Sequence, residues 1–596
     1  FTTATDSYNV AVGNQAGAAV TTGIENTIIG GLAGDALTDA DYNVALGHLA
    51  LSTDRKGNRS TALGRSALAN QNFATSTDSY NTAVGFKAGE AVTTGVENTL
   101  IGGLAGDALT DADFNVAVGS VALSLDTLGS RTTAIGLGAL QNQNFTTATN
   151  TFNVAVGFQA GHDVTTGVEN TIIGALTGDA LTDADGNVAM GTYALSTDTL
   201  GSRSVAIGHS ALLTQNFTTA TNGYNVGVGF DAGRSISTGT ENTLIGGLAG
   251  DALTTGVSNT AVGYRSLSAS NTAGANVAIG GNTMLTDTKG AKNVAVGYGT
   301  LFSQNFTTAT DGYNVAVGFD AGTAITTGLQ NVLIGGTAGD ALTDADNNIA
   351  MGRNALGSDT LGSNSTALGT GALQTQNFTT ATNVFNTAVG FLAGSAVTTG
   401  RNNTLIGAGT GDALTTGGGN TAVGLDALGA NTVGTNNTAV GVNALLTLNI
   451  TSGDAMNTAV GIDAGRRMTT GYRNVCIGAL SGDQITTGTD NLTIGYETGT
   501  YQSNLTTGNG CVLVGPYNDP TDGTANYAMG LGYNLDCAPN FTTLGLGGND
   551  IRAAHGNVTW STVSDERYKK DIVDSTAGLS FINALQPRTF KYKNLG

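Results

Sequence analysis

The chain has 596 residues, of which 90 are glycine and only 4 are proline, and its formal net charge is −21. An acidic chain in which only 11% of residues are charged is not expected to bind nucleic acid, and no apolar run is long enough to span a membrane. Its three cysteines and four histidines show neither a disulfide framework nor the spacing of a metal site.

One short phrase recurs from the first residues onward: Asn, a small or β-branched residue, Ala, an aliphatic residue, Gly, two variable residues and Ala. The glycines that close its strand-like part, Gly13, Gly30, Gly47 and Gly64, recur with a period of 17. A fixed period of this size is typical of a solenoid, in which each repeat forms one rung of a stack.

Some gaps are 21 instead of 17, as between Gly64 and Gly85. Three short rungs and one long rung make a super-repeat with a period of 72, which is also the step from Phe73 to Phe145 and from Phe145 to Phe217. The rung is therefore the unit that is copied along the chain.

Within a rung, the alternation of Val10, Ala11 and Val12 predicts a strand with Val on one face and Ala on the other. We expect the larger aliphatic residues in the interior, and Ala on the second face, where it allows a neighbouring chain to approach closely. Gly13 supplies a corner that a Cβ would obstruct, and Ala16 takes a tight internal position. The Asn that opens each rung is predicted to form a ladder of stacked amides.

These patterns predict an all-β fold, a parallel β-roll or β-solenoid, over residues 1–499. After Gly495 the period fails, and prolines and tyrosines become frequent, so residues 500–563 are predicted to cap the solenoid. Because the chain starts with Phe1 in mid-pattern, we interpret it as a fragment without its N-terminal attachment region.

The repeated phrase resembles the head repeats of trimeric autotransporter adhesins of the YadA-like type, although those heads repeat at a shorter spacing. That resemblance implies a left-handed β-roll in which three chains pack side by side, and hence a homotrimer.

The last segment carries two further motifs, Ser-Asp-x-Arg-x-Lys from Ser564 and Gln-Pro-x-x-Phe-x-Tyr from Gln586. Together they resemble the start of the intramolecular chaperone of phage tail spikes and tail fibres, the endosialidase-type or S74 peptidase family. In that family the domain, which contains α-helices, assembles three chains and then cuts itself off. The resemblance assigns residues 564–596 to a truncated chaperone.

By position, the resemblance implies cleavage of the bond between Val563 and Ser564, with Ser564 as nucleophile. Lys569 would activate it and Asp565 would orient the pair. A Ser hydroxyl needs a neighbouring base at neutral pH, and a Lys with a lowered pKa can serve as one. The alternative is structural, a helix start capped by Ser564 or Asp565.

The segment Gly-Asp-Ala-Leu-Thr-Asp-Ala-Asp recurs along the shaft and places Asp35, Asp39 and Asp41 close together in sequence. Carboxylates repeated on adjacent loops suit calcium, which takes several oxygen ligands. Asp also suits turns and solvated loops, and this interpretation is favoured. No other cofactor is predicted.

Each long rung carries two aromatic residues, as in Phe73 and Tyr80. We favour the interpretation that both fill the wider corner of that rung, and stacking on sugars is the alternative. Cys476 stands where other rungs have Ala, so we expect it to be a small buried residue.

The function favoured by these features is that of a structural, homotrimeric fibre of a phage tail, in the virion or outside the cell. Its expected partners are a host-surface polysaccharide or protein receptor and other tail proteins. Apart from autoproteolysis, no enzyme is predicted. A bacterial trimeric surface adhesin, an extracellular filament and a polysaccharide depolymerase acting through residues 500–563 stay open as alternatives.

Overall fold

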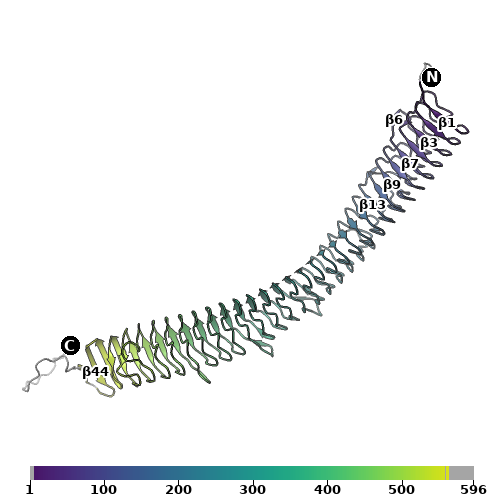
Figure 1. Cartoon of the computed structure of the whole chain (residues 1–596). Helices are drawn as coiled ribbons and strands as arrows, with labels where there is room; N and C mark the ends of the chain where they lie inside the picture. The colour runs from purple at the N-terminus through teal and green to yellow at the C-terminus, as the bar shows by residue number, and fades with distance from the viewer. Residues whose placement is uncertain (1–5, 558, 563–596) are drawn as a thin grey trace, which may run out of the picture. The chain divides into compact units, whose positions relative to one another are not determined.

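In a computed structural model, the chain is described for residues 6–557 and 559–562 and contains only strands, turns and loops within those residues. The predicted fold class is confirmed, because short strands of successive rungs pair in parallel, as Val10 pairs with Thr27 and Thr27 with Val44 (Figure 1). The chain divides into two units, one with residues up to Asn437 and Thr451–Gly453, the other with Thr438–Ile450 and the residues from Asp454 onward.

The first unit is built on one stack of parallel strands. Equivalent positions of successive rungs pair with each other, so that Val10 lies opposite Thr27 and Ala11 opposite Ile28. The strands are β1 (Val10–Val12), β2 (Thr27–Ile29), β3 (Val44–Leu46), β5 (Thr61–Leu63), β7 (Thr82–Val84), β8 (Thr99–Ile101), β9 (Val116–Val118), β11 (Thr133–Ile135), β13 (Val154–Val156), β14 (Thr171–Ile173), β15 (Val188–Met190), β17 (Val205–Ile207), β19 (Val226–Val228), β20 (Thr243–Ile245), β21 (Thr260–Val262), β22 (Val277–Ile279), β24 (Val294–Val296), β26 (Val315–Val317), β27 (Val332–Ile334), β28 (Ile349–Met351), β30 (Thr366–Leu368), β32 (Thr387–Val389), β33 (Thr404–Ile406) and β34 (Thr421–Val423).

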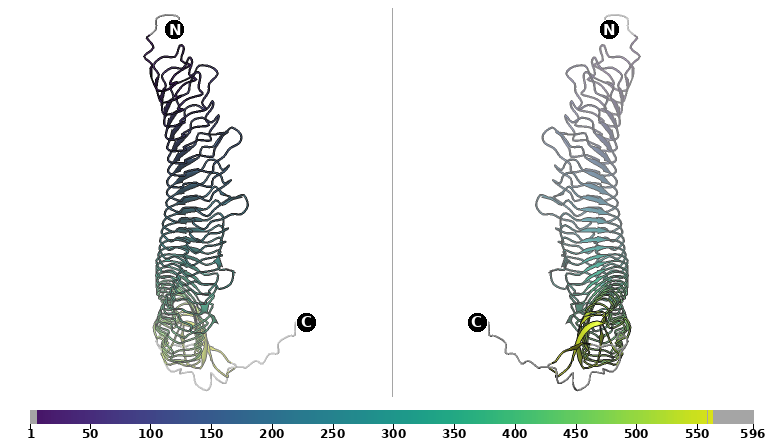
Figure 2. Two further views of the ribbon diagram at one scale, coloured as in Figure 1. Left: turned by 90° about the vertical axis from the view of Figure 1, so that its right-hand side faces the viewer. Right: turned by 90° about the vertical axis from the view of Figure 1, so that its left-hand side faces the viewer.

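The long rungs add a second, two-residue strand pair, and loops project from the first unit at intervals (Figure 2). These pairs are β4 (Gly57–Asn58) with β6 (Thr77–Asp78), β10 (Gly129–Ser130) with β12 (Thr149–Asn150), β16 (Gly201–Ser202) with β18 (Thr221–Asn222), β23 (Gly290–Ala291) with β25 (Thr310–Asp311), and β29 (Gly362–Ser363) with β31 (Thr382–Asn383).

The predicted orientation of the strands is wrong. Ala45, the middle residue of β3, is 0% exposed, whereas its neighbour Leu46 is 43% exposed. The middle residue of the strand, usually Ala, therefore points into the rung, and the aliphatic residues on either side of it point outward. In this rung the small Ala45 side chain packs with Ala50 and Leu51 from the following turn, which are also fully buried. Where the turn has Gly in place of that Leu, as at Gly34, the middle of the strand holds a larger buried residue, Ile28.

Glycine is required where each strand ends. Gly47 has φ +140°, and a Cβ built on it would lie 2.4 Å from the carbonyl oxygen of Gly64 in the next rung. Such a φ is accessible almost only to glycine. The prediction that this corner excludes a Cβ is confirmed.

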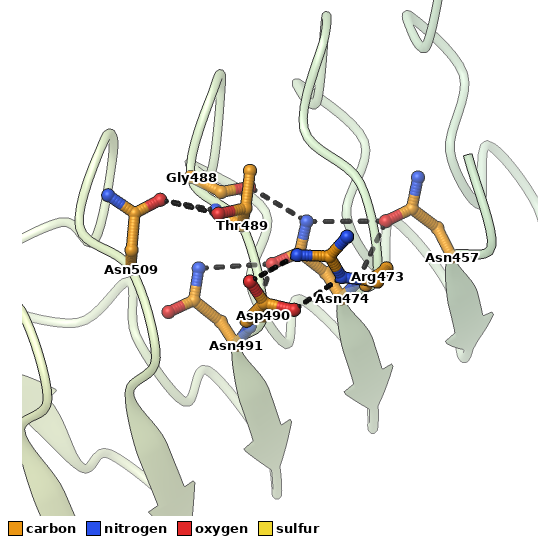
Figure 3. A network of polar contacts seen from close by, with 8 residues as sticks. All are labelled: Asn457, Arg473, Asn474, Gly488, Thr489, Asp490, Asn491 and Asn509. Atoms are coloured by element: carbon orange, nitrogen blue, oxygen red, sulfur yellow. Dashed lines mark hydrogen bonds and ion pairs between the residues drawn. The ribbon is translucent and has the colours of Figure 1, made fainter. Parts of the chain in front are cut away.

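The asparagine ladder is also confirmed, apart from the rungs that carry a hydroxyl residue at its position, Ser60, Thr132, Ser204 and Ser365. The ladder bonds to the backbone as well as to itself (Figure 3). The Asn474 side chain donates to Asn457 Oδ1 at 3.2 Å and to the Gly488 carbonyl at 2.8 Å. Asn474 Oδ1 in turn accepts the backbone N–H of Asn491 at 3.1 Å. Each buried amide thus ties three consecutive rungs together and satisfies a backbone donor and a backbone acceptor at that corner.

Each long rung of the first unit holds a buried network around an Asp and a Gln. Gln143 donates to Asp126 Oδ2 at 2.6 Å and to Thr132 Oγ1 at 3.0 Å, and accepts from Asn153 at 2.9 Å. Asp126 Oδ1 accepts the backbone N–H of Phe145 at 3.0 Å. The same arrangement joins Asp54 to Gln71, Asp198 to Gln215, Asp287 to Gln304, and Asp359 to Gln376.

The second unit continues the parallel pattern in its own residues and ends differently. Its last strands, β43 and β44, pair antiparallel, and β45 pairs antiparallel with β44. Its strands are β35 (Thr438–Val440), β36 (Thr458–Val460), β37 (Val475–Ile477), β38 (Leu492–Ile494), β39 (Val512–Val514), β40 (Asp519–Pro520), β41 (Met529–Tyr533), β42 (Asp536–Cys537), β43 (Phe541–Leu546), β44 (Asn549–Ala554) and β45 (Ser561–Thr562). The predicted domain boundaries at residues 499 and 563 stay predictions.

Candidate functional site

The outward strand face carries a row of exposed apolar side chains, which we call the apolar stripe. It consists of the third residue of many strands and the residue that follows the strand-end glycine. In the first unit its members include Val12, Leu46, Ile101, Ile135, Met190, Ile207, Ile245, Ile279, Met351 and Ile406 from the strands, and Phe86, Leu137, Phe158, Phe230, Tyr264, Tyr298, Phe319, Phe391 and Leu425 from the position after glycine. Repeated exposure of large apolar side chains on one face indicates an interaction surface.

Rings in the apolar stripe stack between rungs. Phe230 lies parallel to His209 with ring centroids 5.4 Å apart, and Phe319 lies parallel to Tyr298 at 5.9 Å. This mutual stacking orders the rings but leaves about half of each Phe exposed, so the stripe keeps apolar area that another chain can cover.

A second row lies at the corner just before each ladder residue, and we call it the corner ridge. Its backbone is left-handed in every rung of the first unit, as in Tyr42 with φ 61° and Arg59 with φ 61°. Over the first rungs its members are Tyr8, Glu25, Tyr42, Arg59, Tyr80, Glu97, Phe114, Arg131, Phe152, Glu169, Gly186, Arg203, Tyr224 and Glu241.

The side chains of the corner ridge contact one another across rungs. The Arg59 guanidinium lies 4.8 Å from the centre of the Tyr42 ring and 5.7 Å from that of Tyr80, and it pairs with Asp78 at 3.2 Å. Arg131 lies 4.7 Å from the Phe114 ring. Charged side chains, Glu and Arg in turn, therefore alternate with aromatic ones along an exposed edge, and cation–π contacts and an ion pair hold Arg59 in place.

The two aromatic residues of each long rung have different environments. Phe73 is 5% exposed and fills the wide corner, as predicted, whereas Tyr80 is 52% exposed. The same division holds for Phe145 and Phe152. The interpretation that both residues plug the corner is thus wrong for the second one, which belongs to the corner ridge.

The recurring aspartates connect rungs. Asp39 accepts a hydrogen bond from the Thr22 hydroxyl at 2.6 Å, and Asp41 accepts from the backbone N–H of Ile24 at 2.9 Å. A buried oxygen of Asp35 has no hydrogen-bond partner. Calcium at Asp35, Asp39 and Asp41 stays a prediction, and among the described residues no group of three or more His, Cys, Asp or Glu is placed to hold a metal ion.

Other copies of the first Asp of this motif sit in partly buried sites. Burial raises the pKa of the Asp107 carboxyl, and the nearby Glu90 raises it further. Burial raises the pKa of Asp179 in the same way, with Asp163 as the acidic neighbour. A carboxylate on the adjacent rung thus makes ionisation of each of these aspartates less favourable.

The region after Gly495 contains a cluster of tyrosines held over a buried carboxylate. The Tyr517 ring lies 4.7 Å from that of Tyr501 and 5.7 Å from that of Tyr533. Asp519 is buried and accepts the backbone N–H groups of Tyr501 and Gln502 at 3.1 Å and 2.5 Å. Burial raises the pKa of Asp519 to about 6, although these hydrogen bonds oppose the shift.

All three cysteines are buried thiols. Burial raises the pKa of Cys476 to about 11 and that of Cys537 to about 12, so neither is a reactive thiolate at neutral pH. Cys476 occupies the interior position that Ala takes in other rungs, which confirms the prediction of a small buried residue.

Ser564, Asp565 and Lys569 lie outside the described residues. Residues 564–595 match the Peptidase S74 family, described as the chaperone of endosialidase. This chain ends in an endosialidase-type chaperone segment. The match confirms the resemblance given by the two C-terminal motifs and places it directly after the β-solenoid.

The chain shows no significant match to a curated protein or to a solved structure. Within the described residues, no helix is long and apolar enough to cross a membrane.

Two groups of residues were missed by reasoning from the sequence, the corner ridge and the buried Asp–Gln pairs. A signal existed for both. The residue before the ladder position follows a four-rung order in the first super-repeats, and Asp126 and Gln143 recur one super-repeat later as Asp198 and Gln215.

Proposed function

We propose that this chain is the shaft of a homotrimeric phage tail fibre that presents a host-binding surface. A C-terminal chaperone assembles it and is then cut off before Ser564. The observation that carries the proposal is the chaperone match at residues 564–595 directly after a β-solenoid. A stack of parallel, non-local rungs folds slowly and finds its register poorly, which gives an assembly domain a clear purpose.

The apolar stripe supports association of copies of this chain. It runs along the strand face of successive rungs, and Phe158 and Phe230 leave about half of their surface exposed. Interface cores favour aromatic and aliphatic residues over charged ones, and the stripe has that composition. Three copies related by a three-fold axis would bury their stripes against one another, as parallel chains in register present the same residue at each level.

Autoproteolysis belongs to the same proposal. Lys569 takes the proton of the Ser564 hydroxyl, whose oxygen attacks the carbonyl carbon of Val563. The peptide C–N bond between Val563 and Ser564 then breaks, the proton passes from Lys569 to the freed Ser564 amine, and water hydrolyses the resulting ester to release the chaperone. Loss of the assembly domain leaves a trimer that cannot readily refold once opened, which is kinetic stability. The shaft itself is proposed to act in adhesion, with a host glycan or protein as receptor and other tail proteins as neighbours.

Sedimentation equilibrium tests the assembly. The full gene product at micromolar concentration is expected to be a trimer. A variant with Phe158→Lys and Phe230→Lys should dissociate, because six charges would then lie in the seam. The matched control, Phe152→Lys with Tyr224→Lys, changes equally exposed residues of the corner ridge and should stay trimeric. A monomeric wild type would contradict the proposal.

A further inference from the structure

The corner ridge changes character along the first unit. Up to Glu241 most of its members are aromatic, Glu or Arg, and aromatic residues recur on alternate rungs, as at Tyr42, Tyr80, Phe114 and Phe152. Beyond that point it is mainly small or amide-bearing, with isolated large residues: Ser258, Ala275, Lys292, Tyr313, Gln330, Asn347, Asn364, Phe385, Asn402, Gly419 and Asn436.

The fold does not require aromatic residues at this position. Asn347 and Asn402 have φ 58°, nearly the same as Tyr42 with φ 61°, so the same corner forms with either type. Asn and Gly adopt this left-handed conformation at lower cost than bulky residues do. The aromatic residues thus occupy a backbone conformation that is unfavourable for them, although Asn or Gly would adopt it at a lower free-energy cost. This indicates that the aromatic side chains have a role outside the fold.

The exposed rings form a regular series. Rungs are about 4.8 Å apart, so rings on alternate rungs recur about every 10 Å. Arg59 lies between Tyr42 and Tyr80 and contacts both rings, while Glu97 occupies the next intervening rung. The edge therefore offers half-exposed aromatic rings at fixed intervals, with a charged, hydrogen-bonding side chain between successive rings.

We propose that the corner ridge from Tyr42 to Phe152 binds an extended neutral polysaccharide. The C–H faces of pyranose rings pack on aromatic rings, and the intervening Arg and Glu side chains hydrogen-bond to sugar hydroxyls. Tyr and Phe supply contact area at little conformational cost. The inference rests on the proposed adhesive function and names the class of ligand and the residues that hold it.

Charge favours a neutral glycan over the other occupants. Glu25 and Arg59, like Glu97 and Arg131, balance each other within the ridge, while the whole chain carries −21. An anionic polymer would be repelled by the acidic solenoid. A second copy of this chain would bury alternating charges in an interface, whereas the apolar stripe already offers a seam without them.

Affinity electrophoresis of the assembled full-length gene product tests the inference. The gels contain mixed-linkage β-glucan, xylan, galactomannan or dextran as neutral polymers, and alginate as an acidic one. The ridge variant carries Tyr42→Asn, Tyr80→Asn, Phe114→Asn and Phe152→Asn. The matched control carries Tyr313→Asn and Phe385→Asn, which change aromatic residues at the same corner where no aromatic lies two rungs away.

The expected result is that at least one neutral polymer retards the wild type and the control equally, while the ridge variant binds about tenfold more weakly or worse. Both variants should melt at or above the wild-type temperature, because Asn relieves strain at the corner. The inference is overturned if no neutral polymer retards a trimeric wild type, if only alginate does, or if the ridge variant binds like the control. A monomeric product that a neutral polymer retards, with the ridge variant not retarded, would contradict the trimer and support the ridge.

Discussion

The rungs up to Glu241 and those from Ser258 to Asn436 share one core and differ at one corner. The ladder is the same in both, since Asn115 and Asn403 each donate a backbone N–H to the preceding Asn at 3.0 Å and 2.9 Å. The next residue toward the N-terminus is aromatic or charged in the first stretch, apart from Gly186, and often Asn in the second. The residues at interior positions are thus determined by what a rung needs in order to stack. The residues at the corner are instead determined, on this account, by the ligand that each stretch of rungs contacts.

The strongest test of the shared core is the glycine that ends a strand. Gly102→Ala should cost about 3 kcal/mol of local stability, since φ is +140° and the new Cβ would lie 2.3 Å from the Gly119 carbonyl oxygen. The adjacent control, Gly103→Ala, meets no atom within 4 Å and should stay within about 0.5 kcal/mol. Hydrogen exchange of the amides of β8 and β9 measures both, and equal effects would contradict the assigned corner.

The buried network gives the next largest effect. Gln143→Leu removes the donor to Asp126 Oδ2 and should destabilise its rung by about 2–3 kcal/mol, because a buried carboxylate oxygen loses its partner. Gln141→Leu, two residues earlier at a half-buried position, is the control and should change stability little. Denaturant unfolding followed by hydrogen exchange reports the difference. A neutral Gln143→Leu variant would show that the network does not hold the long rung together.

Asp519 predicts a pH dependence confined to the tyrosine cluster. Its pKa is raised from 3.8 to about 6, so the folded form binds a proton more tightly than the unfolded chain does. Stability of this region should therefore be highest below about pH 4, fall as the pH rises toward 6, and level off above that. Exchange protection of the Tyr501 and Gln502 amides, corrected for intrinsic rates, measures it. Asp519→Asn should abolish the slope, and a slope that persists or has the opposite sign would refute the assignment.

The contrast between the two stretches can be sharpened by transplanting the ridge. Asn347→Tyr with Asn364→Arg, next to Phe385, recreates the spacing of Tyr42, Arg59 and Tyr80. The double variant should lose about 1 kcal/mol or less from left-handed strain and should bind the neutral polymer of the wild type more tightly. Asn347→Ser with Asn364→Ser is the control. Unchanged binding in the transplant would show that ring spacing alone does not create the site.

The smallest effect is expected inside a rung of the second unit. Cys476→Ala restores the residue that most rungs carry at this position and should change stability by about 1 kcal/mol or less. In the native protein, Cys476 and Cys537 should resist thiol reagents until the chain unfolds, since both are buried. Fast native labelling would contradict their place in the interior.

Much of the fold could be predicted from periodicity. The rungs, the glycine corners, the ladder and the buried Phe73 follow from spacing and residue type. The direction of the strands could not, because alternation along Val44, Ala45 and Leu46 separates two faces without saying which is inside. That choice depends on the volume enclosed by a rung, which is set by turns such as Ala50 and Leu51 that close around it.

The interaction surfaces were harder to predict because residue type does not say which of two similar side chains lies inside a corner. Phe73 and Tyr80 are both large aromatic residues of the same long rung, yet Phe73 is 5% exposed and Tyr80 is 52% exposed. The C-terminal motif was the opposite case. Its side-chain order alone identified the chaperone segment that the family match confirms.

The most direct test of the central claim is the intact mass of the full-length gene product with a complete C-terminal domain, beside a Ser564→Ala variant. The account predicts a wild-type chain that ends at Val563 and a variant that stays uncut, with trimers in both cases. A wild-type protein that keeps its C-terminal domain would contradict the self-cleaving chaperone, and with it the strongest support for a tail fibre.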